Sequence, residues 1–294
     1  MAFQKVGIEV SKTRDFARPL GFAIPDGDFG RNSIPAESLE PETEYFVRAY
    51  FDQNGMRTWS ENIGRFWTLG NLFGIANEYN GVNDFILTIS GTPASTDLEW
   101  SKDGRHWTAV DLKEQQCIVS MQEGERVYLR SSTGFSKTGG ELSIDCEHEY
   151  SAFGDARNLI DYTDIENASL SGSDFIRMFS GSVNIIDASR MELPFTVPSG
   201  ACYFEMFENC ENLAGGPDVM LTSLASDCLQ GMFNGCTLIN RAVVYITSWD
   251  TWNTYLWLGS TAATGDFYNL GGATNIPTGD WDGVPPGWTV HTSL

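Results

Sequence analysis

Apolar and polar positions repeat in three nearly identical stretches of the C-terminal half of the chain. The stretches are residues 174–182, 202–210 and 228–236, and the Met-Phe pair that each contains recurs after 28 and then 26 residues. A single unit of this length cannot bury its own apolar face, so neighbouring units must stack on one another. The pattern therefore predicts a short solenoid with a long exposed side.

The repeats also share an internal pattern. Cys202, Met206 and Cys210 stand four positions apart, which predicts an apolar stripe on one short helix per repeat. A unit of about 20 to 29 residues is typical of a leucine-rich-repeat solenoid. The predicted solenoid core consists of Met178, Phe179, Cys202, Met206, Phe207, Cys210, Cys228, Met232, Phe233 and Cys236. Upstream apolar residues recur at the same period and predict a ladder of short strands: Ile165, Leu193, Val219 and Tyr245.

The first 70 residues show a different pattern. Residues 39–45 read Leu-x-Pro-x-Thr-x-Tyr, and Tyr45, Val47 and Ala49 alternate as the inward face of a strand that returns after Asn54-Gly55. This pattern resembles a tyrosine corner and the closing strands of a fibronectin type III domain. Because such a domain needs about 100 residues, the segment predicts a truncated module without its opening strands.

Residues 71–150 contain short β-rich runs separated by Gly, Asp and Ser turns, which predict a second sandwich-like module. The runs are residues 85–89, 98–100, 106–110, 117–119, 126–130 and 142–144, with a hairpin turn at 101–104. The predicted fold is mainly β with short helices. It has four parts: a fibronectin-like module at 1–70, a β-sandwich module at 71–150, a leucine-rich-repeat solenoid at 151–259 and a C-terminal cap at 260–294.

Charge and hydropathy exclude two classes of partner. The net charge of −21 over 294 residues repels phosphate backbones, so we expect no binding to nucleic acid. The chain has no run of 18 apolar residues, so we expect no membrane insertion. Residues 1–10 alternate like a strand and lack the apolar core of a signal peptide. We therefore expect either assembly in the cytoplasm or an export signal removed from the sequence.

Catalytic and metal-binding patterns are weak. His106, His148 and His291 lie far apart, and no nucleophile elbow, phosphate loop or dinucleotide motif occurs. In residues 146–149, a candidate metal site, only alternate residues such as Cys146 and His148 could share a strand face. The acidic turns at 26–30 and 279–283 resemble calcium loops but lack the bidentate Glu of a full loop. We expect no enzyme, no catalytic, cofactor-binding or metal-binding residues, and no cofactor.

The six cysteines leave two alternatives open. If the stripes are helical, Cys202 and Cys210 lie about 12 Å apart, too far for a disulfide. Stacking would bring Cys202 near Cys228 and Cys210 near Cys236, so bridges between repeats stay open. Buried free thiols, as in a chain assembled in reducing cytosol, are the preferred alternative. The remaining cysteines are Cys117 and Cys146.

Five of the nine tryptophans fall in the last 46 residues. Such rings are expected in the core of a solenoid cap, and the alternative is that some of them form a stacking platform for a glycan. The candidate platform residues are Trp249, Trp252, Tyr255, Trp257 and Trp281.

The order of motifs resembles a known family. Residues 98–107 (LEWSKDGRHW), the Met-Phe-x-x-Cys repeats, residues 276–279 (IPTG) and residues 284–290 (VPPGWTV) occur in this order in BspA-like leucine-rich-repeat surface proteins of gut bacteria and their phages. The resemblance covers residues 85–294 and departs at the first repeat, where Asp174 and Ser182 replace two cysteines. It implies adhesion or display on a surface.

These observations favour a non-enzymatic bacteriophage virion structural protein, such as a head or tail fibre or a decoration protein. We expect residues 1–70 to bind other virion proteins or copies of the same chain through an open strand edge, which favours a homo-oligomer in the assembly. The solenoid and cap would meet the host cell surface or a glycan. The expected location is the virion surface. The alternative is an adhesin on the bacterial cell surface.

Overall fold

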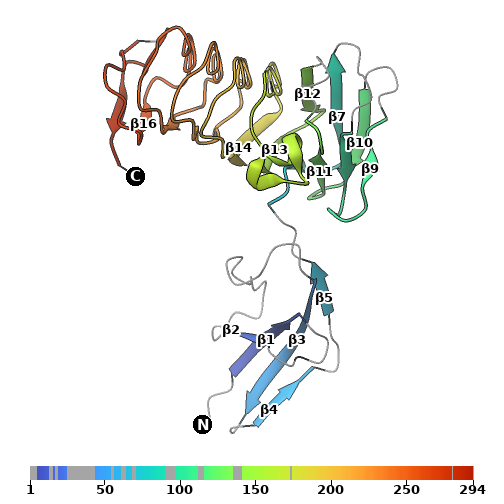
Figure 1. The fold of residues 1–294 in the computed structure, drawn as a ribbon. Helices are drawn as coiled ribbons and strands as arrows, with labels where there is room; N and C mark the ends of the chain where they lie inside the picture. The colour runs from blue at the N-terminus through green and yellow to red at the C-terminus, as the bar shows by residue number, and fades with distance from the viewer. Residues whose placement is uncertain are drawn as a thin grey trace. The chain divides into compact units, whose positions relative to one another are not determined.

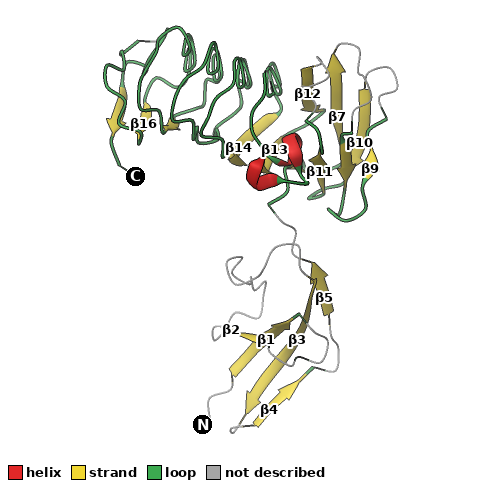
Figure 2. Cartoon of the chain, in the orientation of Figure 1, coloured by secondary structure: helices red, strands yellow, loops and turns green. Residues whose placement is uncertain are grey.

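The computed structural model describes residues 5–12, 16, 19–24, 44–53, 56–60, 64–67, 71–90, 97–111, 116–134, 141–172, 174–279 and 281–293. The chain forms two compact units, Met1–Asn71 and Leu72–Leu294. The described residues are mainly in strands, turns and loops, with two very short helices (Figure 2). The predicted mainly β fold class is confirmed, and the predicted helix in each repeat is wrong.

The first unit contains one antiparallel sheet. Its strands are β1 (Lys5–Ser11), β2 (Leu20–Ile24), β3 (Glu44–Gln53), β4 (Met56–Trp59) and β5 (Gly64–Trp67). The order is β2-β1-β3-β4, and β5 also pairs with β3. The predicted hairpin is confirmed, since Gln53 pairs with Met56 across residues 54–55. Residues 25–43, which include the Leu-x-Pro-x-Thr motif and the acidic turn at 26–30, lie outside the described residues.

One face of this sheet carries a buried charge network. Glu9 is 4% exposed and accepts hydrogen bonds from Arg48 at 2.8 and 3.0 Å, Arg57 at 3.0 Å and Trp59 Nε1 at 2.8 Å. Burial raises the pKa of Glu9, but these hydrogen bonds outweigh it and lower the pKa below its ordinary value. Tyr50 is buried on the same face, beneath Arg57.

The prediction that Ala49 points inward is wrong. Ala49 is exposed and Tyr50 is buried. Successive strand residues face opposite sides of a sheet, and the charge network of Glu9 covers the side that carries Tyr50. Val47 is partly buried.

The second unit begins with two sheets. Their strands are β6 (Gly74–Asn77), β7 (Asn83–Ser90), β8 (Glu99–Ser101), β9 (Thr108–Ala109), β10 (Gln116–Met121), β11 (Arg126–Arg130), β12 (Glu141–Cys146) and β13 (Tyr150–Asp155). One sheet has the order β10-β7-β12, and the other runs β13-β6-β11-β8-β9. All six predicted strands occur, and Glu99 pairs with Ala109 across the predicted hairpin. Strands β6 and β13 were not predicted.

No break separates these sheets from the repeats. Strand β13 pairs with β6 on one side and in parallel with β14 (Ile185–Glu192) on the other. The short helices α1 (Asn158–Asp161) and η3 (Ile165–Asn167) lie between β13 and β14 along the chain. The predicted strand position at Ile165 is therefore wrong. A single hydrophobic core extends from Phe73 to Trp288.

The repeats contain overlapping turns where helices were expected. The N–H groups of Phe204, Met206, Glu208 and Cys210 each donate to the carbonyl three residues earlier. Positive φ angles recur every fourth residue, at Ala201 (54°), Glu205 (51°) and Asn209 (58°). The four-residue spacing of the apolar stripe thus reflects four-residue turns, whereas an α-helix repeats every 3.6 residues.

The intervening N–H groups join one repeat to the next. Those of Tyr203, Glu205 and Phe207 donate to carbonyls of the following repeat, at Cys228, Gln230 and Met232. An α-helix would use these donors within its own segment. The alternating pattern satisfies the backbone of each repeat and binds neighbouring repeats into a stack, seen as successive coils in Figure 1.

The opposite side of the stack is a ladder of short parallel strands. Strands β15 (Arg241–Val244), β16 (Gly265–Asn269) and β17 (Trp288–His291) pair in parallel in this order. Single bridges join Leu193 to Val219 and Val219 to Val244. The predicted ladder is confirmed at Leu193 and Val219, and it continues at Val244, one residue before the predicted Tyr245.

Equivalent side chains of successive repeats stack directly. The ring centroids of Phe179 and Phe207 lie 5.1 Å apart, and those of Phe207 and Phe233 lie 5.5 Å apart, with interplanar angles of 6° and 9°. All ten residues predicted as solenoid core are buried: Met178, Phe179, Cys202, Met206, Phe207, Cys210, Cys228, Met232, Phe233 and Cys236. The core of the stack is built from columns of identical or similar side chains.

Candidate binding surface on the last repeats

Two of the five candidate platform residues belong to the interior. Trp257 is 1% exposed, and its Nε1 donates to the carbonyl of Gly283 at 2.8 Å. Trp249 is partly buried, packs against Trp257 and donates from Nε1 to the carbonyl of Asp282 at 3.0 Å. These indoles hold residues 282–283 on the end of the stack, so they position a surface without forming it.

The other three platform residues are exposed. Trp252 is 84% exposed, Trp281 is 62% exposed and Tyr255 is 39% exposed. The rings of Tyr255 and Trp281 lie 6.0 Å apart at 37°. The N–H of Leu256 donates to the carbonyl of Trp281, which places Trp281 one level further along the stack than Tyr255.

Tyr255 and Trp281 continue a column of outward-facing residues along the turns. Phe204, Gln230 and Tyr255 each stand two positions before a buried core residue, and each is followed by a residue with positive φ. The N–H of Glu205 donates to the backbone carbonyl of Gln230 at 2.8 Å, and the N–H of Gly231 donates to the backbone carbonyl of Tyr255 at 2.9 Å. We call Phe204, Gln230, Tyr255 and Trp281 the outer column.

The loop beneath the exposed rings is well anchored. The N–H of Trp252 donates to Asp250 Oδ1 at 3.0 Å, and Asn253 Nδ2 donates to Asp250 Oδ2 at 3.1 Å. The buried Thr254 hydroxyl lies 3.0 Å from the carbonyl of Asp250 and 3.1 Å from that of Asp282. Exposed rings on a fixed backbone bind a ligand with little loss of conformational entropy.

The sequence analysis missed Phe204 and Gln230, although their positions carry a signal. Phe204 and Gln230 precede the repeated Met206 and Met232 by two residues, as Tyr255 precedes Trp257. Aligning the repeats on the buried residue would have placed all three in one column. The expectation of a helix hid this column, because residues four positions apart in an α-helix do not point in the same direction.

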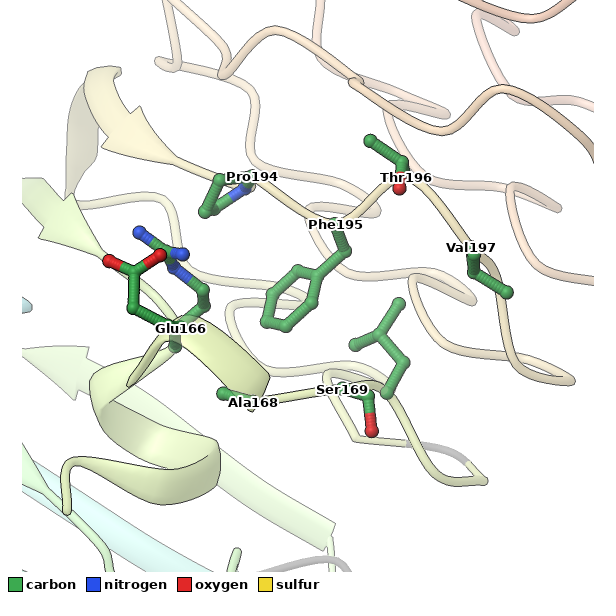
Figure 3. A pocket seen from close by; sticks show the side chains of 9 residues that line it. Glu166, Ala168, Ser169, Pro194, Phe195, Thr196 and Val197 are labelled. Carbon is green, nitrogen blue, oxygen red and sulfur yellow. The ribbon is translucent and has the colours of Figure 1, made fainter. Parts of the chain in front are cut away.

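A small pocket lies elsewhere on the stack (Figure 3). Its volume is about 190 Å³, below the roughly 300 to 1,000 Å³ of sites for drug-sized ligands. The side chain of Phe195 lies between the 194–197 segment and the turn that carries Ala168, while Glu166 lies at one side. Arg157 also lines the pocket. The guanidinium of Arg157 is held by Asp155 at 2.7 Å. The nine lining residues include no histidine or cysteine.

The histidines are dispersed. His106 contacts Asp103 and His291 contacts Asp266, each at 2.6 Å, while His148 stacks on Tyr79. None of these contacts joins a histidine to a serine or cysteine. Among the described residues, no group of three or more His, Cys, Asp or Glu side chains is placed to hold a metal ion.

All six cysteines are free thiols. The thiol of Cys202 lies near that of Cys228, and the thiol of Cys210 lies near that of Cys236, so stacking does bring the predicted pairs together. The neighbouring Cys228 thiol, with burial, raises the pKa of Cys202, and burial raises the pKa of Cys146. Thiols with raised pKa values are poor nucleophiles at neutral pH.

Comparisons with known proteins leave the site to be judged from its own geometry. No family model matches the chain, and neither a curated protein nor a solved structure matches it significantly. Within the described residues, the structure has no helix long and apolar enough to cross a membrane.

Proposed function

We propose that this chain is a non-enzymatic bacteriophage virion structural protein, a head or tail fibre or a decoration protein. It presents a leucine-rich-repeat solenoid to glycans on the host surface. One observation carries the proposal: the exposed rings of Tyr255 and Trp281 lie 6.0 Å apart at the end of the outer column. A single exposed apolar residue is common in folded proteins, whereas adjacent exposed rings form a contiguous apolar patch of the kind that marks a binding surface.

The chemistry of the surface suits a carbohydrate. The C–H face of a sugar ring packs on an indole or phenol, and its hydroxyl groups pair with amides and carboxylates. The outer column supplies rings at Tyr255 and Trp281 and an amide at Gln230. Asp250 and Trp252 belong to the loop that leads into Tyr255.

The stack of repeats supports the solenoid part of the proposal. Each repeat is joined to the next by a regular series of backbone hydrogen bonds on the turn side and by parallel pairing or bridges on the strand side. Such one-dimensional arrays keep a long side open to solvent. The net charge of −21 favours solubility of a surface protein.

The first unit is proposed as the anchor in the virion. Strands β2 and β4 stand at the two ends of its strand order. A strand at the end of a sheet offers backbone groups with which another chain pairs. We propose that other virion proteins, or copies of this chain, dock there and form a homo-oligomer in the assembly.

A glycan array tests the binding function. The full chain is expected to bind a subset of host surface glycans, and Tyr255→Ala or Trp281→Ala is expected to abolish the signal. Tyr79→Ala is the matched control, because Tyr79 is also 39% exposed but lies in the two-sheet region. Equal loss of signal in the control, or no binding by the full chain, would contradict the proposal.

Immunogold labelling tests the location. An antibody to the chain is expected to label intact phage particles and not uninfected bacteria. Labelling of uninfected cells in place of particles would support the alternative, a bacterial adhesin with the same binding surface.

A further inference from the structure

The outer column carries one residue per repeat. Backbone hydrogen bonds link its successive levels from Phe204 through Gln230 and Tyr255 to Trp281. Hydrogen-bonded neighbours in such a ladder lie about 4.8 Å apart. An extended chain of β-linked hexoses advances by a similar step per sugar, so consecutive sugars would meet consecutive levels.

The column combines three aromatic rings with one amide. Phe204 is partly exposed, Gln230 offers two donors and an acceptor, and Tyr255 and Trp281 are the most exposed residues of the column. A single terminal sugar would use only the last two rings. The two earlier levels become useful only when the ligand continues along the stack.

The charges beside the column select against anionic ligands. Glu205 and Glu208 lie beside Phe204, and Asp227 lies near Gln230 along the chain. The guanidinium of Arg177 lies 5.4 Å from the centroid of the Phe204 ring. Its charge is balanced by Glu205, to which it donates a hydrogen bond at 2.6 Å. A sulfated or uronic acid polymer would meet these carboxylates, and the described cation beside Phe204 is already paired with one of them.

We infer that the ligand of the outer column is a neutral, linear, β-linked polysaccharide that runs along the stack, with about four sugars in contact. This inference rests on the proposed glycan-binding function and specifies its ligand class. It assigns Phe204 and Gln230 a role that a terminal-sugar site would not give them.

Isothermal titration with oligosaccharides of increasing length tests the inference. The probes are neutral β-linked series of glucose, N-acetylglucosamine, galactose and mannose, from one to six sugars, with sulfated oligomers of the same length. For at least one neutral series, affinity is expected to rise with each sugar up to about four and then level off. The sulfated oligomers are expected to bind at least tenfold more weakly.

Variants separate the two ends of the column. Phe204→Ala is expected to weaken binding of the tetrasaccharide by about three- to tenfold and to leave the disaccharide unchanged, because one stacked ring is lost. Tyr255→Ala is expected to weaken both. Ser180→Ala, on the same turn surface but outside the column, is the control.

The possible failures are distinguishable. Binding that does not depend on length, or that is indifferent to Phe204→Ala, would overturn the polysaccharide track and leave glycan binding intact. If no oligosaccharide of any series binds the full chain, both the inference and the proposed function fail.

Discussion

The phenol of Tyr150 donates a hydrogen bond to Ser182 Oγ at 3.0 Å, which joins strand β13 to the first repeat. Ser182 stands where the later repeats carry Cys210 and Cys236, whose thiols donate to carbonyls of the preceding repeat. The first repeat packs on β12 instead, where Ser182 donates to Asp145 at 2.6 Å. The departure from the repeat pattern at Ser182 is therefore an adaptation to a different neighbour.

Restoring the repeat consensus at this position should destabilise the protein. Ser182→Cys is expected to lower the free energy of unfolding by about 1 to 3 kcal/mol, because the buried hydroxyl of Tyr150 loses its shorter hydrogen bond and keeps only the 3.3 Å contact with the Ile144 carbonyl. Urea unfolding measures the effect. The same substitution in a Tyr150→Phe background should cost less, and an equal cost in both backgrounds would exclude the hydrogen bond as the cause.

The stacked phenylalanines should dominate the stability of the repeats. Phe207 lies between Phe179 and Phe233, so Phe207→Ala is expected to lower the free energy of unfolding by about 3 to 5 kcal/mol. Val197→Ala, at a side chain 74% exposed, should change it by less than about 0.5 kcal/mol. Similar unfolding curves for the two variants would refute the core assignment.

Alanine substitutions at glycines with positive φ should show how closely neighbouring repeats approach each other. Gly235 has φ of 79°, and a Cβ there would lie 2.5 Å from Asn209 Oδ1 and 3.2 Å from Asn209 Cα. Gly172 has φ of 72° and nothing within 4 Å. Both alanine variants carry left-handed strain of about 1 to 2 kcal/mol, but Gly235→Ala should cost more in thermal unfolding. Equal losses of thermal stability in the two variants would mean that the neighbouring repeat shifts at little cost to make room for the added Cβ.

The Glu9 network should make the first unit sensitive to acid. The folded-state pKa of Glu9 is lowered, so its stabilising contribution is fully present above its unfolded-state pKa and is lost as pH falls through the folded value. Unfolding of the first unit, followed by hydrogen exchange of β1 and β3, should become easier on acidification. Glu9→Gln should flatten this pH dependence, and an unchanged profile would contradict the assignment.

The paired thiols of the repeats should be protected by burial. In the folded protein, Cys202, Cys210, Cys228 and Cys236 are expected to react with a thiol reagent only at the rate of unfolding. The partly buried Cys117 should react first, and Cys117→Ser identifies its contribution. Rapid reaction of four or more thiols under native conditions would show that the stack opens readily.

The sequence by itself determined which residues form the core of the stack and how often they recur. The Met-Phe and Cys positions are buried because one repeat leaves an apolar face that only another repeat covers. Strands in residues 85–146 were equally predictable, since alternation and turn residues are local signals. The hairpin of β3 and β4 was predictable for the same reason.

Only the tertiary structure decided how the backbone of each repeat is bonded. A spacing of four residues fits both a helix and a series of turns, and the choice depends on where alternate N–H groups find acceptors. In this chain the acceptors belong to the next repeat, as Glu205 N–H to the Gln230 carbonyl shows. Propensity within one segment carries no information about a partner 25 residues away, the separation of Glu205 and Gln230.

The binding surface was likewise decided by tertiary packing. Trp257 and Trp281 are the same residue type in the same region, yet one is interior and the other exposed. The difference arises because Trp257 occupies a core column, whereas Trp281 extends the outer column beyond Tyr255. Composition locates the aromatic residues, but exposure depends on which column of the stack each residue joins.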